Sequence, residues 1–232
     1  MLNKKVANYV KNKSSNLKQQ KFGNINVFIK DRPTNNVVLE DVFKHIDSVL
    51  SSDILNLIDI IYVGDFDFLK EKSVNAAYMD GAIYCSNEQD NKEDMIDDLI
   101  HEFAHAVENQ YGYYIYSDAS VEEEFLKKRS KLELILNFEG YDVGQLDFLN
   151  SKYSEKFDLF MYVGIGREKL NAMVMGLFLR GYSVTSLREY FATGFEEYYL
   201  GDRNYLRRLC PSLFAKLTLI NENDLEDEKH EF

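Results

Sequence analysis

The hydrophobic positions of the first ninety residues repeat mostly at the short intervals that strands prefer. Ile25, Val27 and Ile29 alternate with other residues, which indicates one half-buried strand. Asp80-Gly81 stands between two short apolar runs and is typical of a hairpin turn. Val42 and Ile46 recur at helical spacing. The pattern therefore predicts strands over 24–30, 60–63, 76–78 and 82–85, and a helix over 38–50.

From residue 92 onward, apolar residues recur every three or four positions, which indicates helices. Asn91 can cap the first helix and Gly112 can end it, while Ser120 opens the pattern of a capping box and Pro211 suits a first helical position. The expected helices cover 92–112, 120–138, 153–162, 167–180, 185–200 and 202–220. Strands followed by helices predict an α+β fold, with a small mixed sheet in an N-terminal lobe and a mostly helical C-terminal lobe.

Length and charge limit the organisation of the chain and its partners. With 232 residues, 45% of them hydrophobic, residues 23–221 suffice for a single domain with two lobes around a cleft. Residues 1–22 form a lysine-rich N-terminal segment, expected as a helix or a loose lead-in, and residues 222–232 form an acidic tail that is expected to be disordered. The net charge of -12 disfavours binding to nucleic acid.

No segment of the sequence has the pattern of a membrane anchor. The N-terminus lacks an apolar signal region, and the longest apolar run, 172–179, is too short to cross a bilayer. Cys85 and Cys210 are far apart and in no C-x-x-C pattern, so both are expected to be reduced and buried. We expect a cytoplasmic protein that binds neither a membrane nor nucleic acid.

The strongest chemical signal is His101-Glu102-Phe103-Ala104-His105, an H-E-x-x-H pattern within the predicted helix 92–112. Two imidazoles four residues apart point from one face of a helix and can share a metal ion. Glu102 stands close enough to act as general base on a water at that metal. The apolar stripe of this helix runs through Ile96, Leu99, Ile100, Phe103, Ala106 and Val107, and leaves both histidines off it. One catalytic zinc ion is therefore expected.

A catalytic zinc ion usually takes three protein ligands and keeps one position for water. The other histidines, His45 and His230, lie in the predicted helix 38–50 and in the tail, so the third ligand is expected to be a carboxylate. Glu124 has the spacing of the thermolysin-like enzymes, although Lys128 stands where their next aspartate would be, and Glu189 also fits a capping box opened by Ser186. The candidates are Asp118, Glu122, Glu123, Glu124, Glu189, Glu196 and Glu197.

Two stretches resemble the catalytic domain of anthrax lethal factor, a gluzincin whose superfamily includes bacterial proline-specific endopeptidases. Leu99 to Val107, with Tyr111-Gly112-Tyr113 after it, is similar to the metal helix of that family. Glu189-Tyr190-Phe191-Ala192 with Phe195 is similar to its second motif, E-[FY]-F-A-x-x-F. The resemblance covers roughly residues 76–220 and implies a zincin-like fold.

The resemblance also implies roles for particular residues. Glu189 would be the third zinc ligand, and Tyr182, seven residues upstream, would donate a hydrogen bond to the tetrahedral oxyanion. The strand on the cleft edge would pair with an extended peptide or protein substrate. The residues expected in that strand are Ala82, Ile83, Tyr84 and Cys85.

The expected function is therefore a zinc-dependent endopeptidase in which Glu102 is the general base. Two departures from the family stand out: the segment 106–188 is longer, and Thr193 replaces a glutamate that supports the metal site. One alternative is a non-catalytic zincin-fold module with a binding or structural role. Another is a regulatory metallopeptidase dedicated to one intracellular protein.

Overall fold

The fold was obtained as a computed structural model that describes residues 18–222. It is α+β, with a small mixed sheet followed by a mostly helical part, as the sequence predicts. The chain divides into two compact units, which we call unit 1 (through Ala106) and unit 2 (from Val107). Most of the lysine-rich N-terminal segment and of the acidic tail lies outside the described residues. In the described part of the chain, no helix has the length and apolar character needed to span a membrane.

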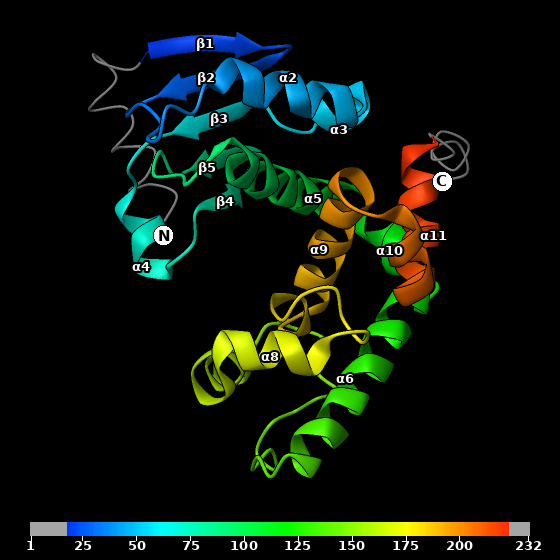
Figure 1. The fold of residues 1–232 in the computed structure, drawn as a ribbon. Coiled ribbons are helices and arrows are strands. Elements are labelled where there is room, and N and C mark those ends of the chain that lie inside the picture. The colour runs from blue at the N-terminus through cyan, green and yellow to red at the C-terminus, as the bar shows by residue number, and fades with distance from the viewer. Residues whose placement is uncertain (1–17, 223–232) are drawn as a thin grey trace. The chain divides into compact units, whose positions relative to one another are not determined.

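Unit 1 contains a five-stranded sheet in the order β1-β2-β3-β5-β4 (Figure 1). The strands are β1 (Lys18–Phe22), β2 (Ile25–Ile29), β3 (Ile60–Val63), β4 (Ala76–Met79) and β5 (Ala82–Cys85). The pairs β2–β3 and β3–β5 are parallel, whereas β1–β2 and β4–β5 are antiparallel hairpins. The four strands expected from the sequence are confirmed.

Strand β1 was not predicted. It lies in the N-terminal segment 1–22, where the sequence indicated a helix or a loose lead-in. Its five residues, KQQKF, show no apolar alternation, so nothing in their pattern favours a strand. Pairing with β2 supplies the missing stabilisation, and Gly23 turns the chain with a φ of +55°, a conformation that glycine adopts without strain. The polar residues suit β1 because it is an edge strand.

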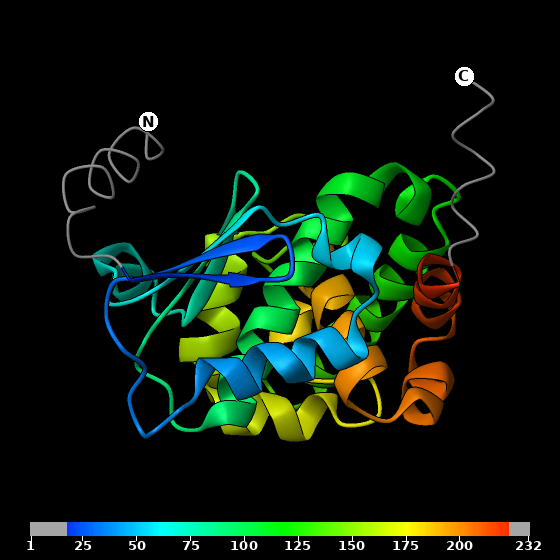
Figure 2. The same ribbon diagram turned by 90° about the horizontal axis from the view of Figure 1, so that it is seen from above.

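One face of the sheet carries the core of unit 1. Val27, Ile61 and Ile83 lie side by side in the strand register and are fully buried. Figure 2 shows helix α2 (Leu39–Val49) running along the sheet, and its Phe43 stacks on Phe22 with ring centroids 4.8 Å apart. Short helices α3 (Ser52–Leu55) and α4 (Asp67–Lys72) join the strands and were not expected. The exposed position of His45 on α2 is as expected.

Helix α5 (Lys92–Tyr116) follows the sheet in the chain and crosses the division between the units. Its start is as predicted, since the Asp94 N–H donates to Asn91 Oδ1 at 2.9 Å. Its end is not, because the helix continues through Gly112 for one more turn. A helix interior tolerates a glycine at a cost of about 1 kcal/mol, and the Tyr116 hydroxyl compensates by donating to Glu108 at 2.6 Å.

Unit 2 consists of helices. They are α6 (Ser120–Phe138), α7 (Glu155–Leu159), the π-helix η2 (Phe160–Gly166), α8 (Arg167–Val174), the 3-10 turn η3 (Tyr182–Val184), α9 (Leu187–Leu200), α10 (Arg203–Leu209) and α11 (Pro211–Asn221). The expected helix 153–162 therefore starts at Glu155 and passes into the π-helix.

Two predictions for unit 2 are wrong. The helix expected over 167–180 ends at Val174, and Gly176 then takes a φ of +74° that a helix does not contain. The capping box at Ser120 does not form either. Its hydroxyl and N–H both donate to Asp118, and Ala119 precedes the helix in a left-handed conformation. The position of Pro211 at the start of α11 is confirmed.

Candidate metal centre

The histidines of the H-E-x-x-H pattern and its glutamate converge within unit 1. His101, Glu102 and His105 each offer one potential ligand atom, and these atoms all lie within 4.8 Å of one another. The two imidazole rings are nearly perpendicular, with centroids 4.8 Å apart. Glu102 is 7% exposed and His105 is 6% exposed, whereas His101 is half-buried, so the group is partly open to solvent through His101. The helical spacing that the sequence indicated therefore produces a compact group of two nitrogens and a carboxylate.

The chemistry of this group fits zinc. Two nitrogens bound to one tetrahedral zinc ion, at the usual bond length, lie about 3.4 Å apart. The potential ligand atoms of the group lie at most 4.8 Å apart, so small side-chain rotations would bring two nitrogens to that separation. Imidazole is a preferred zinc ligand. His101 and His105 are therefore suited to hold the ion, and Glu102 is suited to act beside it.

Glu102 makes one further contact, to the edge of the sheet. Its Oε2 accepts a hydrogen bond from the backbone N–H of Tyr78 in β4 at 2.5 Å. Strand β4 is the last strand on its side of the sheet in the described residues. The N–H of Tyr78 therefore points outward from the sheet and towards Glu102 of α5.

The strand expected to bind the substrate, residues 82–85, does not lie at an edge of the sheet. Ala82, Ile83, Tyr84 and Cys85 form β5, which pairs with β3 on one side and with β4 on the other. Both edges of β5 are occupied, so its backbone cannot pair with a substrate. The strand that has an open edge in this hairpin is β4 (Ala76–Met79).

The buried Cys85 and the half-buried Asp98 lie near Glu102. Burial raises the pKa of the Cys85 thiol well above its usual range, and the nearby Asp98 and Glu102 raise it further. A thiol that keeps its proton is a poor zinc ligand, because the thiolate is the ligating form. Burial also raises the pKa of Asp98 to about 6, although Gln89 Nε2 donates to its carboxylate at 3.1 Å.

In unit 2, Glu124 has a structural role that competes with metal binding. One carboxylate oxygen accepts the Tyr190 hydroxyl at 2.8 Å, and the other accepts the N–H of Ser212 at 2.8 Å. The N–H of Leu213 donates at 3.4 Å to the oxygen that also accepts the Tyr190 hydroxyl. Ser212 and Leu213 lie in the first turn of α11, where backbone N–H groups lack helical partners. Glu124 therefore caps α11, which argues against the thermolysin-like spacing.

The other carboxylates considered as third ligand, Asp118, Glu122, Glu123, Glu196 and Glu197, also have protein partners. Asp118 pairs with Lys216 at 2.9 Å, and Glu122 accepts the Ser151 hydroxyl at 2.5 Å. The buried Glu196 lies 2.5 Å from Arg180. Glu123 pairs with Lys127, and Glu197 accepts the N–H of Asp202 at the end of α9. Each of these carboxylates has a local contact that explains its position.

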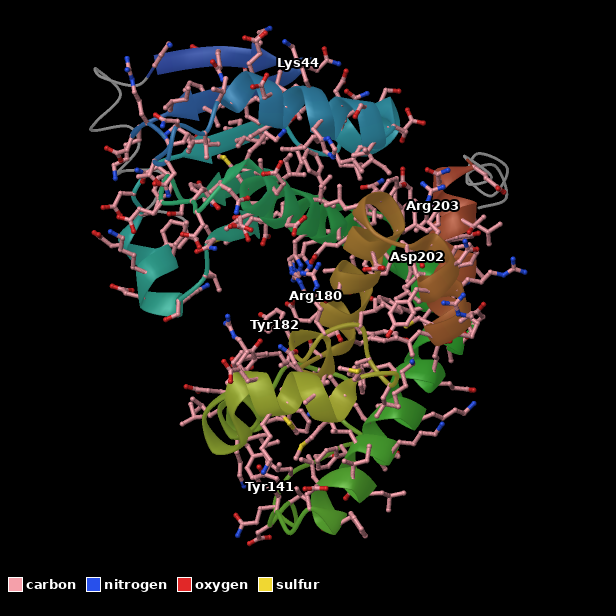
Figure 3. The ribbon with its side chains drawn as sticks, viewed as in Figure 1. Lys44, Tyr141, Arg180, Tyr182, Asp202 and Arg203 are labelled. Atoms are coloured by element: carbon pink, nitrogen blue, oxygen red, sulfur yellow. The ribbon has the colours of Figure 1, made fainter. Side chains whose placement is uncertain are left out.

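Glu189 and Tyr182 lie close to each other in unit 2. Figure 3 shows Tyr182 and Arg180 on the segment that leads from α8 towards α9. Burial and then the negative charge of Glu189 raise the pKa of Tyr182 above its usual value, so its hydroxyl stays protonated. Tyr162 packs against the Tyr182 ring with centroids 5.9 Å apart. Ser186 caps α9 by accepting the N–H of Glu189, as the sequence predicted.

The predicted site residues thus form two groups, each described within its own unit. His101, Glu102 and His105 lie together in unit 1, and Tyr182 and Glu189 lie together in unit 2. Thr193 is buried inside α9. No residue pattern predicts the contact between Glu102 and Tyr78, because its donor is a backbone N–H, which every residue except proline carries.

Comparisons with family models, with curated proteins and with solved structures found no match to this chain. The resemblance to the lethal factor family therefore stays a proposal that rests on the two motifs.

Proposed function

We propose that this protein is a zinc-dependent endopeptidase of the lethal-factor-like gluzincin type. The observation that carries the proposal is the convergence of His101, His105 and Glu102 on one partly buried stretch of α5, with their potential ligand atoms within 4.8 Å of one another. A group of two imidazoles and a carboxylate at this spacing suits a zinc ion with a general base beside it. Glu189 is proposed as the third ligand on the second motif.

Each side chain has a defined task in the proposed reaction. A zinc ion held by His101, His105 and Glu189 would lower the pKa of a bound water and polarise the scissile carbonyl. Glu102 would take the proton of the attacking water and deliver it to the leaving amine. Tyr182 would donate its hydroxyl proton in a hydrogen bond to the developing oxyanion. The raised pKa of this hydroxyl supports that task, because a phenolate could not donate.

The open edge of β4 is proposed to bind the substrate backbone in place of the strand that the sequence indicated. An extended peptide adds to a sheet through main-chain hydrogen bonds, so it needs a strand with an unpaired side. Strand β4 has that side, and its Tyr78 contacts the proposed base directly.

The test combines metal analysis with peptide cleavage. The purified protein should carry about one zinc per chain, and X-ray absorption should show only nitrogen and oxygen ligands. His101→Ala should lose the metal, whereas His45→Ala, which changes an exposed histidine on α2, should keep it. Glu102→Gln should keep zinc and lose cleavage of a random peptide library. A zinc-loaded wild type that cleaves no peptide would instead favour a non-catalytic binding module.

A further inference from the structure

The edge strand β4 alternates between groups that face β5 and groups that face outward. The N–H of Ser86 donates to Asn75 O at 2.7 Å, so the backbone of Asn75 faces β5. In an antiparallel pair the direction alternates from residue to residue. Ala76 and Tyr78 therefore face away from β5, in agreement with the bond from the Tyr78 N–H to Glu102.

We propose that the backbone N–H of Tyr78 is a positioning group for Glu102, which it holds in the orientation that the base requires. This inference rests on the proposed function. Glu102 comes from α5 and Tyr78 from β4, so the bond ties the metal helix to the sheet edge at the reactive carboxylate. A hydrogen bond to an ionised acceptor is about twice as strong as a neutral one. One carboxylate oxygen is thereby occupied, and the rotation of the side chain is restricted.

The outward-facing backbone groups of β4 would then have two roles, one in holding Glu102 and one in binding a substrate strand. The N–H of Tyr78 serves Glu102, which leaves the carbonyl of Tyr78 and both backbone groups of Ala76 for an added strand. A substrate would thus bind beside a base whose direction is already set. Preorganisation of this kind affects kcat, because a base that rotates freely spends less time aimed at its proton.

The hydrogen bond itself is tested in zinc-free protein by NMR. The amide proton of Tyr78 should resonate downfield and exchange slowly, and Glu102→Ala should shift it upfield and speed its exchange. The amide of Ala76 faces outward on the same strand without this acceptor, and should be unaffected by the substitution. An unchanged Tyr78 amide in Glu102→Ala would overturn the proposal, whatever the activity of the enzyme.

The catalytic consequence is tested by replacing only the donor. The α-hydroxy analogue of tyrosine, introduced at position 78 by nonsense suppression, converts this amide to an ester and removes the N–H. The ester protein should bind zinc as before and lose kcat by on the order of ten- to a hundredfold, with KM little changed. Tyr78→Ala keeps the N–H and should therefore lose clearly less kcat than the ester protein.

The two proposals fail in different ways. If wild type cleaves peptides and the ester protein keeps full kcat, the positioning role is wrong and the peptidase stands. If Tyr78→Ala loses kcat as strongly as the ester does, the tyrosine ring is responsible and the positioning role is also wrong. If zinc-loaded wild type cleaves nothing, the peptidase proposal falls, and the positioning role falls with it.

Discussion

The choice of third zinc ligand depends on Glu124, and replacing it separates its two interpretations. Glu124→Ala removes the cap of α11, which costs about 1 kcal/mol. It also takes an acceptor from the buried Tyr190 hydroxyl, at about 1–3 kcal/mol. The free energy of unfolding should therefore fall by about 2–4 kcal/mol, which lowers the Tm of a chain of this size by roughly 5–15 °C.

The assay is thermal and urea unfolding together with a zinc titration. Glu124→Ala should be clearly less stable but should bind zinc with the Kd of wild type at a temperature where both are folded. Glu123→Ala is the matched control. Glu123 forms a surface ion pair with Lys127 at 3.5 Å, and loss of this ion pair should lower the free energy of unfolding by less than about 1 kcal/mol. A Glu124→Ala protein with normal Tm and no bound zinc would refute the capping role and restore the thermolysin-like spacing.

Three further predictions concern the site. Glu189→Ala should weaken zinc binding by at least tenfold in a competition titration; an unchanged Kd would remove Glu189 from the ligand set. Tyr182→Phe should keep zinc and Tm but lose kcat by about a hundredfold, and full kcat with lower stability would make Tyr182 a packing residue. Burial raises the pKa of Asp98 in the folded state from 3.8 to about 6. As pH rises, this carboxyl therefore loses its proton at a lower pH in the unfolded chain than in the folded protein. In zinc-free protein the free energy of unfolding should therefore fall by about 1–3 kcal/mol as pH rises through that window, and Asp98→Asn should flatten the fall measured by urea titration.

Elements with strong local signals could be predicted from the sequence. The Asp80-Gly81 turn places β4 and β5 correctly, and Asn91 and Ser186 cap the helices that they were expected to open. Strand β1 could not be predicted, because its polar residues are held in place by pairing with β2 and not by their own pattern. Local signals also misplace helix ends. Gly112 lies inside α5, whereas α8 stops before Gly176.

In the candidate site, too, the residues related by local spacing could be predicted, whereas those that depend on long-range contacts could not. The group of His101, Glu102 and His105 lies within five residues of one helix, so helical spacing alone is enough to predict it. The third ligand is a different case, because the contacts that give Glu124 a structural role come from residues 66 to 89 positions away. Sequence spacing carries no information on such contacts, and it left Glu124 and Glu189 as rivals.

The substrate-binding strand was assigned to the wrong strand of the hairpin because the sequence does not show the order of the strands in the sheet. Residues 76–79 and 82–85 form one hairpin, and nothing local distinguishes its inner strand from its outer one. The order is set by the parallel pairing of β3 with β5, which places Ile61 beside Ile83 in the buried core. Across the hairpin, Ile83 pairs with Tyr78 of β4, which is only half-buried, as suits an edge strand. Because β3 pairs with β5 and not with β4, β4 keeps the open side in the described residues, and the N–H that faces Glu102 comes from Tyr78.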